Sequence, residues 1–139
     1  MPRARVLQAR TAIAALRSVV RTIEKAAPTV AADIDRQLEQ LEASTVQFAQ
    51  MRASHLVQSG AARLDASERA ETERLFAGHS PAQAMMLGPN AAASDVQTAA
   101  LDGIARWRNS AADPLADRLY IEVCDVVTRT YEQFYASTV

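Results

Sequence analysis

Two long apolar seams, separated by one proline, constrain the fold of this chain more than any other feature. In the first 27 residues, apolar side chains recur in alternating steps of three and four: Val6, Ala9, Ile13, Leu16, Val20, Ile23 and Ala27. This spacing is a heptad pattern, which packs one helix against another. We therefore predict a helix from about Arg3 to Ala27, ended by Pro28, because proline disfavours helical geometry in the residue before it.

A second long helix is predicted from about Thr29, a good N-cap, to about Ser59, with Gly60 placed to cap its C-terminus. Its apolar stripe is Ile34, Leu38, Leu41, Thr45, Phe48, Met51 and His55. The very short connection forces an antiparallel hairpin. The charges agree with this pairing, because Arg17, Arg21 and Lys25 would lie beside Asp33, Asp35, Glu39 and Glu42.

Shorter helices are predicted after Gly60. Asp65 and Glu68 form a capping box that opens a helix to about Phe76, and Ser80-Pro81 opens a short helix ending at Gly88-Pro89. A second capping box is predicted at Ser94–Gln97, opening a helix to about Ser110 that buries Val96, Ala100, Ile104 and Trp107. Asp113-Pro114 is expected to start the last helix, from Leu115 to about Ala136.

The last helix has an unusually wide apolar face. Its apolar residues are Leu115, Leu119, Tyr120, Val123, Cys124, Val126, Val127, Tyr131, Phe134 and Tyr135. They cover more than half of the helix circumference, which is wider than the stripe of an ordinary surface helix. We therefore expect contact on two sides, with a helical partner or a second copy covering what the chain itself leaves in water.

Composition supports an all-α protein in a reducing compartment. Alanine is abundant and sheet-type alternation is missing, which favours helix. Charge is balanced, with 15 basic and 16 acidic residues, so nucleic acid is not an expected partner. Cys124 is the one cysteine and excludes an intrachain disulfide, so a cytoplasmic location is expected. We predict a hairpin over residues 1–59 and a helical subdomain over 60–139 packed on it.

Catalytic and metal-binding patterns are missing from the sequence. His55 and His79 are isolated, Cys124 has no partner at helical spacing, and the glycines do not form a phosphate-binding loop. We therefore expect no enzyme activity, no metal and no cofactor. The arginines of the first helix, including Arg10 and Arg17, permit a lipid-binding interpretation, but pairing with the acids of the second helix is favoured.

Arg106-Trp107-Arg108 is the least ordinary motif. Helical spacing places Trp107 on the face of Val96 and Ile104, so we predict a buried packing anchor. The flanking arginines are expected to cover apolar surface with their stems while their charges stay in water. The residues predicted to pack or to form contacts with a partner are Trp107, Arg106, Arg108, Pro114, Leu115, Tyr120, Tyr131, Phe134 and Tyr135.

The stretch from about Met86 to Ala136 contains a series of short motifs: Leu87-Gly88, Ala99-Ala100, Trp107-Arg108, Ala111, Pro114-Leu115, Cys124, Arg129 and Glu132. In these motifs the sequence resembles the C-terminal end of actinobacterial dynamin-like GTPases of the isoniazid-inducible type. The two long upstream helices resemble the stalk helices that precede this tail. The resemblance thus covers nearly the whole chain.

The resemblance implies a helical stalk and tail without the nucleotide-binding part. Such GTPases bind GTP through a domain with a P-loop and switch regions, and this sequence has neither. The expected role is therefore non-catalytic: assembly, and coupling to a dynamin-like GTPase, with any membrane association made through that partner. The alternatives are an independent helical interaction module, such as a homodimeric scaffold, and a membrane-surface binder acting through the first helix.

Overall fold

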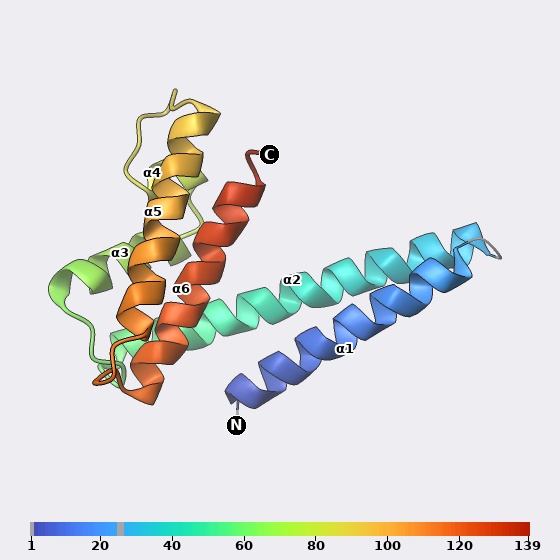
Figure 1. Cartoon of the computed structure of the whole chain (residues 1–139), viewed down its shortest axis with the longest axis horizontal. Helices are drawn as coiled ribbons and strands as arrows, with labels where there is room; N and C mark the ends of the chain where they lie inside the picture. Colours follow the sequence, from blue (N-terminus) through green and yellow to red (C-terminus); the bar gives the residue numbers. More distant parts are fainter. Residues whose placement is uncertain (1, 25–26) are drawn as a thin grey trace. The chain divides into compact units, whose positions relative to one another are not determined.

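A computed structural model describes residues 2–24 and 27–139, and its described part contains six helices and no strand (Figure 1). The helices are α1 (Pro2–Ile23), α2 (Pro28–Gln58), α3 (Ala66–Phe76), α4 (Pro81–Ala84), α5 (Ala93–Ala111) and α6 (Arg118–Ala136). The predicted all-α class is confirmed. The chain divides into a hairpin unit, residues 1–51, and a C-terminal unit, residues 52–139. This division lies inside α2, whereas the sequence placed it after residue 59.

The hairpin unit has a thin core. Val20 of α1 packs with Ala31 and Leu38 of α2, and Ile34 covers this cluster while remaining half-buried. Arg17 forms an ion pair with Glu42, which confirms one of the expected pairings between the two helices. The predicted pairing of Lys25 and the seam position at Val6 lie outside the described residues and side chains.

The reversal between α1 and α2 differs in detail from the prediction. Helix α1 ends at Ile23 rather than Ala27, and α2 begins at Pro28 itself. Thr29 is therefore inside the helix and is not its N-cap. Proline suits the first helical position because the N–H group it lacks would have no partner there, and its fixed φ is already helical.

The second half of α2 faces different neighbours than the predicted stripe implies. Phe48 and Met51, assigned to that stripe, are exposed, and so is His55. The buried residues are instead Ala53, Leu56 and Val57, which join the core of the C-terminal unit. The predicted stripe continues the hairpin seam along α2, but in the last turns of the helix the buried side chains belong to a different core and lie on another face.

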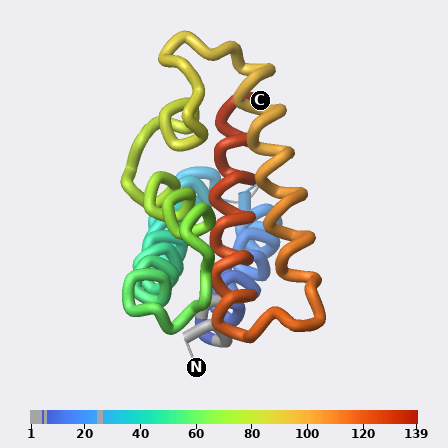
Figure 2. Tube along the Cα trace, turned by 90° about the vertical axis from the view of Figure 1, so that its left-hand side faces the viewer, coloured from blue at the N-terminus to red at the C-terminus, as the bar shows by residue number. Residues whose placement is uncertain are grey.

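The C-terminal unit is built around α5 and α6, which pack along their lengths (Figure 2). Ala100, Ile104 and Trp107 of α5 meet the buried face of α6, and the end of α2 together with α3 and α4 completes the core. The buried face predicted for α5 is confirmed. The buried core residues on α6 are Val123, Cys124, Val127 and Tyr131.

Local capping signals place several helix ends. The capping box of Asp65 and Glu68 opens α3, and Ser80 caps α4 with Pro81 at the first position, both as predicted. Helix α4 ends at Ala84, earlier than expected, and Met86 takes a positive φ of 58°. Gly60, at φ 75°, donates its N–H to the Val57 carbonyl just after α2, as a C-terminal cap does.

Two predicted helix starts are wrong. Helix α5 begins at Ala93, and its N-cap is Ala92 with no side-chain cap; the predicted cap, Ser94, lies inside the helix. The Ala92 carbonyl already accepts the N–H groups of Asp95 and Val96, so the helix starts without a serine cap.

The last helix is capped by Asp117 rather than by Asp113. The Asp113 side chain accepts the Leu115 N–H at 2.9 Å, and its carbonyl accepts the Ala116 N–H, so Asp113-Pro114 forms a separate turn. Leu115 is 92% exposed and is not part of the helix. Across the described residues, no helix has the length and apolar character that crossing a bilayer requires.

Candidate functional site

Arg106-Trp107-Arg108 connects three parts of the C-terminal unit. Trp107 is 2% exposed, which confirms the predicted packing role. Both arginine side chains stay largely exposed, and each also forms an ion pair that the sequence did not predict: Arg106 with Glu71 of α3, and Arg108 with Glu132 of α6. The motif therefore ties α5 to both neighbours around a buried ring.

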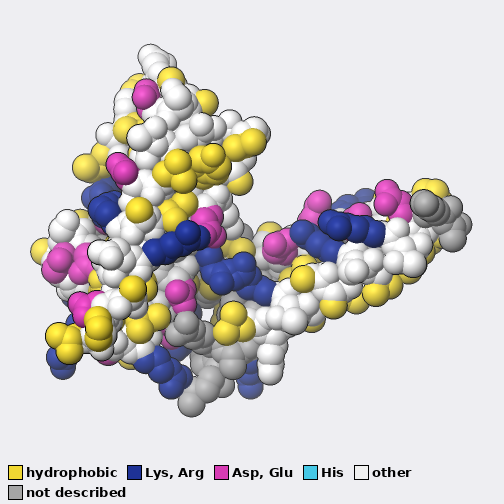
Figure 3. Space-filling model, in the orientation of Figure 1, with side chains coloured by type: hydrophobic (Ala, Val, Ile, Leu, Met, Phe, Trp, Pro, Cys, Tyr) yellow, Lys and Arg dark blue, Asp and Glu magenta, His cyan; other side chains and the backbone are white. Residues whose placement is uncertain are grey.

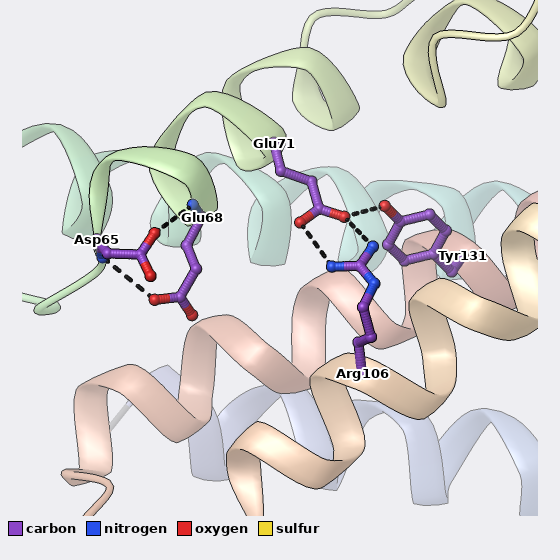
Figure 4. Close-up of polar contacts among 5 residues, drawn as sticks. All are labelled: Asp65, Glu68, Glu71, Arg106 and Tyr131. Atoms are coloured by element: carbon purple, nitrogen blue, oxygen red, sulfur yellow. Dashed lines mark hydrogen bonds and ion pairs between the residues drawn. The ribbon is translucent and has the colours of Figure 1, made fainter.

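Glu71 is the centre of a mostly buried polar cluster (Figure 4). Arg106 donates two hydrogen bonds to it, Nη2 to Oε1 at 2.7 Å and Nη1 to Oε2 at 3.3 Å. The Tyr131 hydroxyl of α6 donates to the same Oε1. The Glu71 side chain is only 9% exposed, whereas the Arg106 side chain is 60% exposed. In this ion pair the arginine is therefore exposed to solvent, whereas the carboxylate is buried.

The protonation state of this cluster follows from its geometry. Burial by itself would raise the pKa of Glu71, but the hydrogen bonds from Arg106 and Tyr131 and the nearby indole N–H of Trp107 outweigh it and lower that pKa. The Trp107 Nε1 atom is buried, and its N–H group has no partner among the described residues at ordinary hydrogen-bond distance and angle. Burial and the Glu71 carboxylate both raise the pKa of Tyr131. At neutral pH the cluster therefore holds a carboxylate, a guanidinium and a neutral phenol.

Gly103 allows Tyr131 to reach this position. A Cβ atom at residue 103 would lie 2.6 Å from the Tyr131 ring, closer than any real contact. The ring thus packs directly against the backbone of α5, and it meets the ring of Phe134 edge-on at 6.2 Å. Glycine is needed here for space, because Gly103 lies buried inside a helix and not at a turn.

A second polar contact joins the start of α6 to α3. Tyr120 donates its hydroxyl to Glu68, the same residue that closes the capping box with Asp65. Burial raises the pKa of Tyr120, and the hydrogen bond to Glu68 raises it further. Burial likewise raises the pKa of the neighbouring Cys124 thiol to about 11, so this cysteine is a protonated core residue at neutral pH.

A third contact joins α2 to α6 within the same unit. Arg52 Nε donates to Glu122 Oε1 at 2.6 Å, and the Glu122 side chain is 9% exposed. Three carboxylates, Glu71 on α3 and Glu122 and Glu132 on α6, are thus each paired with an arginine of another helix. These contacts fix how α2, α3, α5 and α6 lie against each other, and no reactive group is placed among them.

The wide apolar face of α6 is covered by the chain itself. Tyr131 is buried, and Tyr120, Phe134 and Tyr135 are half-buried against the core of the C-terminal unit. The chain itself therefore supplies the second side of contact expected for this helix, and binding of a helical partner or a second copy stays a prediction. Pro114 and Leu115 do not join the cluster, since both lie exposed in the turn before α6. In the described residues no group of His, Cys, Asp or Glu is arranged to hold a metal ion.

Three residues of these contacts were not predicted from the sequence: Glu71, Gly103 and Glu122. Glu71 looked like one of several exposed acids near the start of a helix, and only its position three residues after Glu68 placed it on the face that carries the Tyr120 contact. Gly103 offered one signal: a glycine in an alanine-rich helix is unfavourable unless another element approaches closely.

Comparison with curated proteins finds one relative, in two strains of Mycobacterium tuberculosis. The chain is 35% identical to the isoniazid-induced protein IniC over 136 residues, which is 96% of this chain and 27% of IniC. The chain thus spans about a quarter of the length of the relative that it matches, and the similarity runs through both the hairpin and the C-terminal unit. No family model matches, and no solved structure matches.

Proposed function

We propose that this chain is a non-catalytic, stalk-like helical domain of the dynamin-like type, which serves assembly and couples to a GTPase or membrane-remodelling partner. The observation that carries the proposal is the similarity to IniC over 96% of the chain but only 27% of the relative. The matched segment is the size of one helical region of a larger protein. The assignment to the dynamin-like type rests on the resemblance of the sequence motifs to dynamin-like tails.

The architecture supports this proposal. A long hairpin leads through α2 into a unit whose helices are tied together by buried and half-buried ion pairs. Two residues of the resembling motifs, Arg108 and Glu132, pair directly across α5 and α6 at 2.6 Å. These motif residues therefore form a contact between two helices, as packing residues of a helical domain do.

Two measurements test the proposal. The purified chain should show no saturable GTP binding at micromolar nucleotide and no GTP hydrolysis, because its sequence has no phosphate-binding loop. It should also co-purify with an IniC variant from which the matched 136 residues have been deleted. Saturable GTP binding would contradict the non-catalytic role.

The second measurement has its own control. Full-length IniC, which keeps its own copy of the matched segment, should compete with the added chain and retain less of it than the deleted variant. Equal retention by both proteins, or none by either, would favour the alternative of an independent helical interaction module. Such a module is supported by the exposed apolar residues of the hairpin unit.

A further inference from the structure

The hairpin unit exposes apolar side chains that its own core does not use. Leu16 and Val19 on α1, and Val30, Leu41 and Phe48 on α2, are each between 47% and 54% exposed. The buried residues beside them are few: Ile13, Val20, Ala31 and Leu38, with Ile34 half-buried. We call these five exposed residues the apolar face.

Helix geometry places the apolar face on one side of the hairpin. A step of three residues rotates a side chain by about 60° around the helix axis, relative to the residue it starts from. Leu16 is one such step from buried Ile13, and Leu41 is one such step from buried Leu38. Because α1 and α2 run in opposite directions, equal rotations from facing positions turn both side chains to the same side.

Midway along the hairpin, charged residues lie on the opposite side. Arg17 follows Ile13 by four residues and Glu42 follows Leu38 by four, which turns both the other way, and they form an ion pair with each other. Figure 3 shows this division along α1 and α2, with hydrophobic side chains gathered on one edge and charged side chains on the other. The hairpin unit is therefore amphipathic as a pair of helices.

Charge also differs along the hairpin. Its open half, residues 2–12 and 45–51, contains Arg3, Arg5 and Arg10 and no aspartate or glutamate. Its turn half, residues 13–44, holds all five carboxylates of residues 1–51, Glu24, Asp33, Asp35, Glu39 and Glu42, against the four basic residues Arg17, Arg21, Lys25 and Arg36. Two hairpins stacked in parallel would bring their arginine-only halves together. Antiparallel stacking would instead set each such half beside the carboxylates of the other copy.

We propose that the apolar face binds the same face of a second copy, forming an antiparallel four-helix bundle around a twofold axis near Leu16. The proposal rests on the assembly part of the function proposed above and names its partner. A face of 22 residues along α1 is about 33 Å long, and two helices are about 20 Å wide. Its area, roughly 600–700 Å² per copy, approaches the ~800 Å² per partner of a stable interface.

Light scattering of the whole chain at tens of micromolar tests the proposal, with Leu41→Glu as the disrupting variant. Leu7→Glu is the matched control, because Leu7 is 50% exposed and Leu41 is 51% exposed, but helical rotation places Leu7 on the charged side. Wild type and Leu7→Glu should have the mass of two chains, and Leu41→Glu the mass of one, with helical content unchanged in circular dichroism.

The orientation is tested by spin labels at the turn. In Val30→Cys combined with Cys124→Ala, the two labels of an antiparallel dimer should lie about 30–40 Å apart, against less than about 20 Å in a parallel one. A short distance would overturn the antiparallel arrangement. A monomeric wild type, or equal disruption by Leu7→Glu and Leu41→Glu, would overturn the dimer itself. Co-purification of the chain with the deleted IniC variant is a separate measurement. The proposed function and the proposed dimer can therefore fail independently.

Discussion

The two units of this protein differ in the contacts that hold their helices together. In the C-terminal unit, apolar residues from α2 to α6 share one core, and arginine–carboxylate pairs connect the helices across it. In the hairpin unit, a few residues form the core, and several large apolar side chains remain exposed. The comparison indicates that the C-terminal unit is stabilised by its own contacts, whereas the hairpin is suited to further contacts.

The largest expected effect concerns the tryptophan of the C-terminal core. Trp107→Ala removes a buried indole and should lower the free energy of unfolding by about 3–5 kcal/mol. Leu7→Ala, at a half-exposed position of the hairpin outside the apolar face, should cost about 1 kcal/mol or less by contrast. Urea unfolding followed by circular dichroism measures both variants. Equal losses would show that the two units do not differ in the way described.

Gly103→Ala should have the next largest effect, about 1–3 kcal/mol of destabilisation, as is typical of overpacked cores. The added methyl group would meet the Tyr131 ring at 2.6 Å, and that ring is held by its bond to Glu71. Gly88→Ala is the control, because nothing lies within 4 Å of a Cβ at that position. Thermal unfolding of the two variants measures the difference, and equal stability would mean that α5 and α6 pack less closely than described.

Acid should weaken the C-terminal unit through Glu71. The folded protein holds the pKa of Glu71 below its ordinary value of 4.5, so the ionised form is favoured in the folded state. The resulting stability is complete above the unfolded pKa and is lost as pH falls through the folded pKa. Glu71→Gln should therefore reduce the loss of unfolding free energy between pH 6 and pH 3.

The matched comparison for that experiment is Glu73→Gln, an exposed carboxylate on the same helix. It should keep the acid dependence of the wild type. If both variants flattened the pH profile equally, the acid sensitivity would come from general charge on α3 and not from the buried cluster.

The smallest effect is expected at the exposed pair of Arg108 and Glu132. Their side chains are 65% and 45% exposed, so Arg108→Ala should change the free energy of unfolding by about 0.5 kcal/mol or less, and less still in high salt. Denaturant unfolding at low and high ionic strength measures it. A loss above about 1.5 kcal/mol would indicate that this pair contributes more than an ordinary surface ion pair.

Sequence alone determined the features that depend on neighbouring residues. The capping box of Asp65 and Glu68 and the cap at Ser80 lie within three residues of their partners, so local spacing sufficed to predict them. The buried face of α5 followed from helical periodicity in the same way. The wrong prediction of a helix start at Ser94 has the same origin. A capping pattern indicates that a helix can start at a residue, but it does not require the helix to start there.

Tertiary structure decided the contacts between residues distant in the chain. Glu71 lies 35 residues from Arg106 and 60 from Tyr131, and nothing in their local sequence distinguishes this carboxylate from its exposed neighbours. Packing also decided that α6 is covered by its own unit, and that the last turns of α2 bury a different face from the one that continues the hairpin seam. Periodicity shows which side of a helix is apolar, but what covers that side depends on where the other helices lie, because burial is a property of the assembled core.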